Sequence, residues 1–360
     1  MEVQLNSKTI LVFPFNAMGH YLRCITLAKN YPDYNILFPS SSKYNKFVQS
    51  AGFETFESQH FDVNKVMDDA KSFNFDWLNE KDLYQVLTAQ IEAINKFKPE
   101  FVIGDTAPTL KMACEVTNTK YVSVLNGYMS KYYTLPRPLP NDHSLNKLLN
   151  RLPKKYRIVL LRKGQDIAFY FIHTPFKKIR NRLNLKPQRT YLDELEGDKN
   201  FICDQQELFP QKKLPENYRI IGPLSYTNSA SEEEVLSRLD PTKKTICVCM
   251  GSTGNWSKLE FLSDKFFSKF NIITTGDTKR VVKGNHIIPR AFLNLDVVLP
   301  KCDYFICHGG NGTIYNSLKH HTPLYCLPAH FEQEWNAERI EELGLGENIN
   351  NKAKEVLYSL

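Results

Sequence analysis

The residues best placed to do chemistry lie close together near the end of the chain, between positions 304 and 337. A short apolar run ends in the sequence HGGNGT, from His308 to Thr313, and a helical pattern follows it. This order predicts a buried strand, a glycine turn and a helix N-terminus. The first N–H groups of the helix and the positive end of its dipole then point at one place, which the glycines leave open to a ligand. The segment therefore predicts a binding corner for a phosphate group.

A second set of polar residues follows the next predicted strand, Pro323 to Leu327. We expect a loop carrying Glu332 and Gln333 there, with a helix beginning at Trp335 and Asn336. Because ligands of open parallel sheets bind at the carboxyl ends of the strands, both loops should face one crevice. A carboxylate and an amide suit hydroxyl groups. A diphosphate joined to a sugar would match the two loops together.

A candidate base lies in the first part of the chain. His20 comes soon after the predicted strand Thr9 to Phe13, and Asp105 directly follows the predicted strand Phe101 to Gly104. A histidine can take a proton from a hydroxyl near neutral pH, and a carboxylate on its other ring nitrogen fixes the tautomer. Each residue also has an ordinary alternative, since polar residues at these places commonly cap helices. Spacing alone leaves both interpretations open.

Five segments in this order resemble the UDP-glycosyltransferase and macrolide-glycosyltransferase group of GT-B glycosyltransferases. They are FPFNAMGHYLRCITLA, FVIGDTAPTLKMA, LFPQKKLPENYRIIGPL, CVCMGSTGN, and the HGGNGT segment with its helix, proline, acid-Gln pair and NA. The resemblance implies an α/β protein of the GT-B fold, with two Rossmann-like domains facing each other across a cleft. The first βα turn lacks the GxGxxG of a dinucleotide-dependent dehydrogenase, which argues against that class.

The resemblance also implies a reaction and the residues for it. The reaction is inverting transfer of a hexose from a UDP- or dTDP-linked sugar to an acceptor hydroxyl, with no metal and no cofactor beyond the nucleotide sugar. His20 and Asp105 match the family's catalytic dyad. The alternative for the glycine loops is that they merely close βα units. The implied nucleotide-sugar-binding residues are Gly251, Ser252, Thr253, Phe292, Leu293, His308, Gly310, Asn311, Gly312, Thr313, Asn316, Glu332 and Gln333.

Three departures from the family pattern concern the rest of the donor. Asn316 stands where the family has a glutamate that accepts both ribose hydroxyls. Phe292 and Leu293 occupy the loop that normally carries an aromatic residue, a proline and a glutamine around the base, and Phe292 can still stack on a pyrimidine. Glu332 replaces the commoner aspartate. The choice of base, and of ribose against deoxyribose, therefore stays open.

The acceptor side is predicted from two aromatic-rich segments of the first domain, residues 62–79 and 127–140. A flat apolar aglycone such as a polyketide, terpenoid or phenolic would fit such a lining, and a lipid is the second candidate. Packing of these rings inside the core is the alternative. The predicted acceptor-binding residues are Phe75, Trp77, Tyr128 and Tyr132.

The net charge of +7 is concentrated in residues 147–186, which hold twelve Lys and Arg against one acid, Asp166. Apolar and aromatic residues alternate with these cations. Such a pattern is compatible with peripheral contact to an anionic membrane, or with an acidic acceptor. An ordinary solvated basic face is the simpler alternative. Nucleic-acid binding is not expected, because no recognised binding motif accompanies the charge.

Alternating strands and helices predict a first domain over residues 1–221 and a second over 244–360, joined by a polar linker over 222–243. The family resemblance implies about forty residues beyond the position of Leu343, whereas this sequence stops at Leu360. Either the interdomain clasp is reduced or another chain supplies it. The oligomeric state remains open.

Composition predicts a cytoplasmic protein. No apolar run approaches the roughly 18 residues of a membrane span, and the polar start lacks the regions of a signal peptide. The eight cysteines show no CxxC or Cys/His ligand spacing. Two other functions remain open on the same fold, a sugar-nucleotide epimerase and a non-catalytic GT-B subunit. The candidate dyad favours transfer, while Asn316 favours the non-catalytic subunit.

Overall fold

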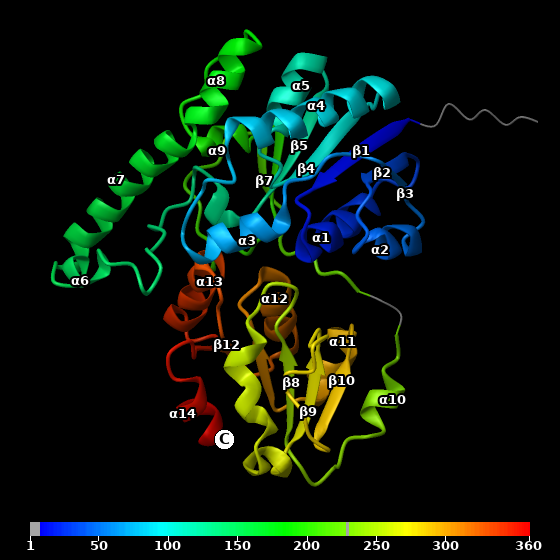
Figure 1. The fold of residues 1–360 in the computed structure, drawn as a ribbon, viewed down its shortest axis with the longest axis vertical. Coiled ribbons are helices and arrows are strands. Elements are labelled where there is room, and N and C mark those ends of the chain that lie inside the picture. Colours follow the sequence, from blue (N-terminus) through cyan, green and yellow to red (C-terminus); the bar gives the residue numbers. More distant parts are fainter. Residues whose placement is uncertain (1–7, 228–229) are drawn as a thin grey trace, which may run out of the picture. The chain divides into compact units, whose positions relative to one another are not determined.

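The computed structural model describes residues 8–227 and 230–360. The polar start, residues 1–7, and two residues of the predicted linker lie outside the described residues. The chain divides into two compact units, Met1–Leu224 and Ser225–Leu360. Each unit is built on one parallel sheet with helices between the strands, as Figure 1 shows. The prediction of two Rossmann-like domains is therefore confirmed.

Unit 1 contains a seven-stranded sheet of order β3-β2-β1-β4-β5-β6-β7, and every pair is parallel. Its central strands are almost fully buried, because both faces of a parallel sheet are covered and the sequence there is a continuous apolar run. The strands are β1 (Thr9–Pro14), β2 (Asn35–Pro39), β3 (Glu54–Phe56), β4 (Phe101–Asp105), β5 (Lys120–Leu125), β6 (Lys199–Ile202) and β7 (Tyr218–Ile220).

The helices of unit 1 connect these strands in sequence order. The longest are α4, which packs on α5, and α7, which lies within the basic segment 147–186. The helices are α1 (Met18–Ala28), α2 (Asn45–Ser50), α3 (Val63–Lys71), α4 (Glu80–Phe97), α5 (Leu110–Thr117), η1 (Gly127–Met129), α6 (Asn146–Leu149), α7 (Lys154–Ile172), α8 (Thr174–Arg182) and α9 (Tyr191–Glu194).

Unit 2 repeats the plan with a six-stranded parallel sheet of order β10-β9-β8-β11-β12-β13. Its strands are β8 (Thr245–Cys249), β9 (Asn271–Thr275), β10 (Ile287–Arg290), β11 (Tyr304–Cys307), β12 (Leu324–Cys326) and β13 (Glu347–Asn348). Its helices are α10 (Glu233–Leu236), η2 (Trp256–Ser263), η3 (Lys265–Lys269), α11 (Leu295–Val298), η4 (Leu299–Lys301), α12 (Asn311–His320), α13 (Phe331–Glu342) and α14 (Ala353–Tyr358).

The strand order reverses once in each sheet, and the two candidate sites lie at these points. In unit 1 the reversal falls between β1 and β4, where Pro14 lies opposite Asp105. In unit 2 it falls between β8 and β11, where Cys249 lies opposite Cys307. Loops that leave neighbouring strands in opposite directions open a crevice at such a point, and ligands of open α/β sheets bind there.

Two expected loops contain helices. The segment around Glu332 and Gln333 was expected to be a loop, but α13 begins at Phe331, so both residues lie in its first turn. Phe331 and Trp335 explain the earlier start, since they are one turn apart and their rings meet at 4.9 Å. The segment 62–79 likewise contains α3, whose first turn is capped by the carboxylate of Asp62.

No helix among residues 8–227 and 230–360 combines the length and the apolar character needed to cross a bilayer.

Candidate functional site

The predicted dyad forms in unit 1. His20 lies in the first turn of α1, and Asp105 is the last residue of β4. The Nδ1 atom of His20 lies 3.0 Å from Oδ1 of Asp105. The carboxylate is fully buried, whereas one fifth of the histidine side chain is exposed. The pair therefore has a buried acid and an imidazole that still reaches solvent.

Arg23, one turn after His20 on α1, is part of the same cluster. Its Nε donates to Oδ2 of Asp105 at 2.7 Å, and its Nη2 donates to Oδ1. Its Nη1 donates to the amide oxygen of Asn126, which follows β5. Arg23 as a residue is 8% exposed, so this two-pronged ion pair is largely shielded from water. Arg23 was not among the site residues predicted from the sequence, although its spacing of three residues from His20 on a predicted helix was a usable signal.

Asp105 is held as an anion. Burial by itself would raise the pKa of this carboxyl group, but the charge of Arg23 and the contact with His20 outweigh it and hold the pKa well below the ordinary range. A carboxylate oxygen can only accept, so the hydrogen of the contact between His20 and Asp105 is on Nδ1 of His20, which donates to Oδ1. Nη2 of Arg23 donates to the same oxygen. The neutral imidazole then carries its free lone pair on Nε2, the nitrogen available to a substrate.

Thr106, the residue after Asp105, has an unusual backbone. Its φ of +50° lies in the left-handed region, which a β-branched residue rarely adopts. Its hydroxyl donates to Oδ1 of Asp105 at 3.2 Å. Backbone strain of this kind at Thr106 persists only where the surrounding structure fixes it, as at functional sites.

Two thiols, Cys24 and Cys203, border the cluster. Burial raises the pKa of both, so they are neutral.

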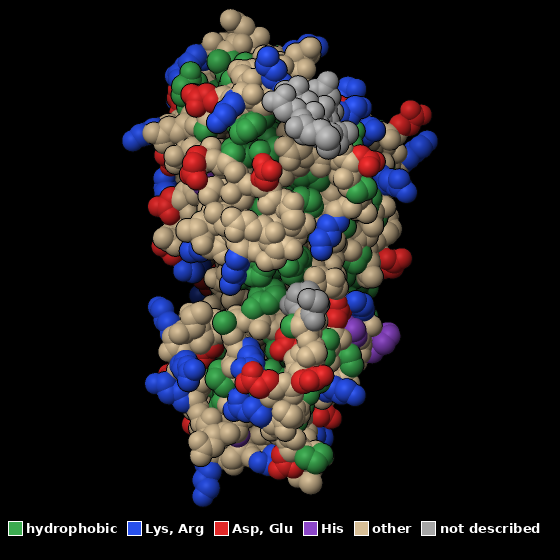
Figure 2. All heavy atoms as spheres, turned by 90° about the vertical axis from the view of Figure 1, so that its right-hand side faces the viewer, with side chains coloured by type: hydrophobic (Ala, Val, Ile, Leu, Met, Phe, Trp, Pro, Cys, Tyr) green, Lys and Arg blue, Asp and Glu red, His purple; other side chains and the backbone are tan. Residues whose placement is uncertain are grey.

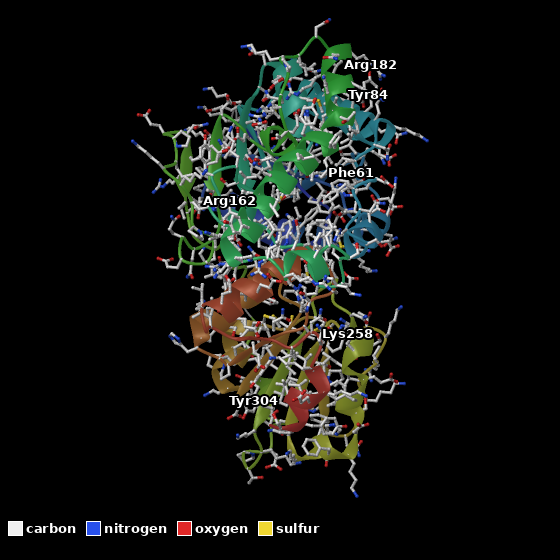
Figure 3. All side chains as sticks on the ribbon, turned by 90° about the vertical axis from the view of Figure 1, so that its left-hand side faces the viewer. Phe61, Tyr84, Arg162, Arg182, Lys258 and Tyr304 are labelled. Atoms are coloured by element: carbon white, nitrogen blue, oxygen red, sulfur yellow. The ribbon has the colours of Figure 1, made fainter. Side chains whose placement is uncertain are left out.

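A hollow opens beside the dyad at the carboxyl ends of β1 and β4. It has about 380 Å³ of space, its open mouth included. Phe15 connects it to the dyad, since its ring meets that of His20 edge to face at 5.6 Å. The lining is mainly apolar, with Phe61, labelled in Figure 3, among its rings. The residues around it are Phe13, Pro14, Phe15, Asn16, Pro39, Gln59, His60, Phe61, Val86, Gln90, Thr106, Ala107 and Pro108.

The four predicted acceptor residues are placed differently. Trp77 is buried, and its ring contacts Phe15 and Phe61 at 6.0 and 5.2 Å, so it supports the wall of the hollow. Tyr128 is a core residue whose hydroxyl accepts from the amide of Asn126.

The other two lie in half-buried positions. Phe75 packs edge to face on Phe73 at 5.7 Å, and Tyr132 packs on Tyr218 at 5.0 Å. Trp77 contacts two rings that line the hollow, whereas Tyr128 is packed in the core, as the alternative interpretation expects.

The glycine corner of unit 2 is built around the imidazole of His308. A Cβ placed on Gly251 would lie 2.6 Å from this ring, and one on Gly310 would lie 2.5 Å from it. Both loops therefore need glycine for the ring to fit between them. Gly251 and Gly309 also have φ of +54° and +84°, which glycine adopts without strain. The loop after β8 and the loop after β11 therefore form one corner.

His308 is neutral in this corner. Its Nδ1 lies 3.4 Å from the carbonyl oxygen of Cys249, and burial lowers the pKa of the imidazole to about 4. With Nδ1–H directed at that carbonyl, Nε2 is an acceptor. Helix α12 begins directly beyond, with Gly310 as its N-cap, so the first N–H groups of the helix have no partner within it.

The first turn of α13 holds the corner in place. The side-chain amide of Gln333 donates to Oγ1 of Thr253 at 2.8 Å and accepts from the backbone N–H of Ala329 at 2.9 Å. Asn336 donates to the carbonyl of Gly309 at 2.9 Å and to the side-chain oxygen of Asn311 at 2.6 Å. Gln333 thus connects loops of the protein, whereas the sequence suggested sugar hydroxyls as its partners. The sequence analysis did not assign a role to Asn336.

The remaining predicted donor residues have different surroundings. Oδ1 of Asn316, on α12, is buried and has no hydrogen-bond partner among the described residues. The hydroxyl of Thr313 donates to the carbonyl of Gly310 at 2.8 Å. Phe292 is half-buried against Tyr226, while Leu293 is buried. Ser252 and Gly312 are exposed, and Glu332 is half-buried.

Known proteins are similar to this chain in sequence and in fold. Residues 292–355 match the family model described as UDP-glucoronosyl and UDP-glucosyl transferase. A PGL/p-HBAD biosynthesis glycosyltransferase of Mycobacterium tuberculosis is 21% identical, over 91% of this chain and 77% of the relative. A PGL/p-HBAD biosynthesis rhamnosyltransferase of Mycobacterium bovis is 20% identical, over 91% and 74%. A further Mycobacterium bovis relative, 22% identical over 68% of this chain and 66% of its own length, is described as an inactive PGL/p-HBAD biosynthesis glycosyltransferase.

Solved structures with the same fold are glycosyltransferases. The spinosyn rhamnosyltransferase SpnG superimposes with a TM-score of 0.65 at 13% identity, over 98% of this chain and 88% of its own. The calicheamicin glycosyltransferase CalG4 gives 0.62 at 16% identity, over 95% and 84%. VinC, solved in complex with dTDP, gives 0.63 at 15% identity, over 97% and 90%. The chain is a glycosyltransferase of the GT-B fold, related to the UDP-glycosyltransferase and macrolide-glycosyltransferase group.

Proposed function

We propose that this protein is an inverting glycosyltransferase that moves a sugar from a UDP- or dTDP-linked donor to a hydroxyl group of an apolar aglycone or a lipid. Unit 1 supplies the base for the acceptor hydroxyl, and unit 2 binds the nucleotide diphosphate. The single observation that carries the proposal is the hydrogen bond between Nδ1 of His20 and the buried carboxylate of Asp105, at the strand-order reversal of the first sheet.

The proposed step balances without a covalent enzyme intermediate. Nε2 of His20 accepts the acceptor's proton as the acceptor oxygen forms a bond to C1 of the sugar. The bond between C1 and the diphosphate oxygen breaks at the same time, and its electron pair leaves with the diphosphate. Asp105 stabilises the imidazolium that results. Attack opposite the leaving group turns an α-linked donor into a β-linked product.

The leaving diphosphate needs positive potential, and the corner of unit 2 can supply it. The first N–H groups of α12 and the positive end of its dipole point at the position proposed for the phosphates. Donors fixed before the reaction stabilise charge as it grows on the leaving group, without a cost of reorientation. The acceptor oxygen of Asn316 has no partner in the described chain, so a ribose hydroxyl that donates to it would satisfy it.

The descriptions of related proteins support the donor and acceptor classes. VinC was solved in complex with dTDP, and SpnG was solved in complex with the spinosyn aglycone. Two relatives are named for PGL/p-HBAD biosynthesis, and one of them is a rhamnosyltransferase. The apolar hollow beside His20 is consistent with an apolar acceptor.

The reaction can be tested with the purified chain, a panel of UDP- and dTDP-sugars, and a panel of hydroxylated aglycones and lipids. We expect mass spectrometry to find a glycosylated acceptor and an equal amount of free nucleotide diphosphate. NMR of the new linkage reports its configuration, and a retained configuration would refute inversion. An epimerase would give an isomerised nucleotide sugar, or diphosphate release without an acceptor.

The non-catalytic alternative is favoured by one observation of this structure. Arg23 compensates the charge of Asp105, so less of that charge is left to stabilise a protonated His20. A non-catalytic chain would bind UDP or dTDP by calorimetry and give no product with any acceptor. Measuring binding and turnover on the same sample separates the two functions.

A further inference from the structure

The large apolar side chains that unit 1 exposes are concentrated on one short part of it. Fourteen large apolar residues of the described chain are exposed, and eight of them lie between positions 145 and 171, on α6 and α7. Figure 1 shows α7 leaning away from the sheet of unit 1, with α6 at its far end. The eight are Leu145, Leu148, Tyr156, Val159, Leu160, Ile167, Tyr170 and Phe171.

Helix α7 has two apolar faces, and only one of them is covered. On the covered face, Phe169 is buried against Tyr191 with ring centres 6.4 Å apart, and the side-chain amide of Gln165 donates to the carbonyl of Arg137. Six of the exposed residues lie on α7, at positions 156, 159, 160, 167, 170 and 171. Each is one, three or seven positions after the one before it. Such spacings place them along one stripe of a helix, here on the side opposite Phe169.

The exposed stripe lies among cations. Residues 145–172 contain seven Lys and Arg and one acid, Asp166. None of the seven forms an ion pair with a residue of the described chain. The neighbouring helix α8 differs, because its Arg180 and Arg182 are paired with glutamates. The seven cations are Lys147, Arg151, Lys154, Lys155, Arg157, Arg162 and Lys163.

The two sides of unit 1 differ in how their charges are mixed. Figure 3 views the molecule from the side of α7, with Arg162 labelled on that helix. Figure 2 shows the opposite side, where Lys and Arg side chains are interspersed with Asp and Glu. An evenly mixed surface is what solubility requires. A stripe of apolar residues bordered by cations with no acidic partner fits an anionic apolar boundary instead.

We propose that the exposed face of α6 and α7 binds the surface of an anionic lipid bilayer. Aromatic and aliphatic side chains enter the boundary between head groups and acyl chains, and the flanking Lys and Arg contact lipid phosphates. Helix α7, at 19 residues, is long enough to lie along the surface over about 28 Å. This inference deepens the proposed function, because a chain bound to a bilayer would meet a lipid acceptor there, and in that respect it rests on the proposed function. The binding itself requires neither donor nor transfer.

Charge decides between a bilayer and a second copy of the chain. Two copies of this face would bring two strongly positive surfaces together, with one Asp166 each to offset seven cations. Like charges at an interface disfavour association. An anionic bilayer supplies the opposite charge and an apolar interior in one partner, so it satisfies both features of the face.

Vesicle flotation of the full chain tests the proposal. Vesicles of phosphatidylcholine alone are compared with vesicles that also contain phosphatidylglycerol. We expect the wild-type chain to float with the anionic vesicles and to remain below with the neutral ones, and added salt should weaken the binding. Absence of the chain from the anionic float fraction at low salt would overturn the proposal, whatever the outcome of the transferase assay.

Two triple variants separate the contributions of charge and apolar surface. Lys155→Gln/Arg157→Gln/Lys163→Gln should weaken vesicle binding by about 100-fold, at about 5-fold for each cation. Val159→Ser/Ile167→Ser/Phe171→Ser should weaken it by about 10-fold or more. The matched controls are Lys212→Gln/Lys213→Gln, two exposed cations elsewhere in unit 1, and Leu343→Ser/Leu345→Ser, two exposed leucines of unit 2. Both controls should bind as the wild type does.

The results for these variants also decide whether α7 is the contact with the bilayer. If the α7 variants bind as tightly as the wild type while their circular dichroism is unchanged, the membrane contact lies elsewhere and the proposal fails. If sedimentation shows a wild-type dimer that the apolar triple variant converts to a monomer, the face is an interface between copies. Specific loss of flotation in the two α7 variants, with both controls unaffected, supports the assignment.

Discussion

Arg23 donates to both carboxylate oxygens of Asp105, while His20 shares one of those oxygens through Nδ1. The cluster of three therefore contains an anion that is already compensated before the histidine takes up a proton. A carboxylate with no other counter-charge stabilises an imidazolium more strongly. Arg23 is thus a positioning residue that holds the carboxylate of Asp105 beside His20.

Replacing Arg23 tests this relationship directly. In Arg23→Met the carboxylate of Asp105 keeps its contacts with His20, Thr106 and the Cys24 thiol but loses its ion pair with the guanidinium. A buried carboxylate without its cationic partner should lower the free energy of unfolding by about 3 kcal/mol or more. Denaturant unfolding monitored by circular dichroism measures this difference.

Arg23→Lys is the matched control, since it keeps the charge and loses the fork geometry. Its free energy of unfolding should fall by less, because a cation still faces the carboxylate. Equal stability of the wild type and of Arg23→Met would show that the guanidinium does not hold Asp105.

The dyad itself should be required for transfer. His20→Ala removes the base and Asp105→Asn removes the charge that stabilises its protonated form, so each should reduce kcat by about 10²- to 10⁴-fold. Nucleotide affinity should be unchanged, because the diphosphate corner lies in unit 2. Kinetics with calorimetry measure both quantities. Thr26→Ala, on the same helix with its hydroxyl bonded to the carbonyl of Leu22, should keep full activity, whereas full activity in His20→Ala would end the mechanism.

The glycine corner offers a pair of neighbouring substitutions with opposite expectations. A Cβ at Gly310 would lie 2.5 Å from Nε2 of His308, whereas one at Gly312 has no atom within 4 Å. Gly310→Ala should therefore displace the imidazole, lower the free energy of unfolding by about 1–3 kcal/mol and weaken binding of UDP or dTDP. Gly312→Ala should change neither. Thermal melts and calorimetry decide, and equal behaviour of the two variants would contradict the proposed packing.

Diphosphate binding should be linked to protonation of His308. Burial lowers the pKa of this imidazole to about 4 in the free protein, so it is neutral at pH 7. A diphosphate beside the ring favours the charged form, which raises the pKa in the complex. Binding then takes up a proton, and affinity should rise as pH falls from the higher bound-state pKa toward 4, by at most about tenfold per pH unit.

Calorimetry in buffers of different ionisation enthalpy counts the protons taken up. The diphosphate has its own titration, which His308→Gln retains, so the difference between wild type and variant isolates the histidine. Identical proton uptake in both would mean that His308 does not contact the phosphates.

Asn316 should distinguish a nucleotide from a bare diphosphate. Its buried side-chain oxygen has no partner in the described chain, and a ribose hydroxyl is the donor we expect there. Asn316→Leu should weaken binding of UDP by about 1–3 kcal/mol and leave binding of inorganic pyrophosphate unchanged. A loss of equal size for both ligands would indicate a general disturbance of α12.

Much of the fold and of the candidate site could be predicted because it depends on local sequence. The central strands are apolar runs that end at turn residues, and the glycine corner is coded within six consecutive residues, 308–313. The rule that parallel strands present ligands at their carboxyl ends then brought His20 and Asp105 together, although 85 positions separate them. The edge strands β3, β7, β10 and β13 were not predicted, since such short segments carry too little pattern.

Tertiary packing decided the rest. Whether Tyr128 lines a site or fills the core depends on Phe209, which packs on its ring from a distant part of the chain. Gln333 looks like a sugar ligand in the sequence, yet in the folded unit its amide joins Thr253 to Ala329. The partner of Arg23, Asp105, lies 82 residues away along the chain. Its carboxylate is shielded from water only in the folded sheet, and that shielding strengthens the ion pair. The sequence determined which groups stand at the strand ends, and the packing determined which of them remain available to a ligand, because availability depends on neighbours that are distant along the chain.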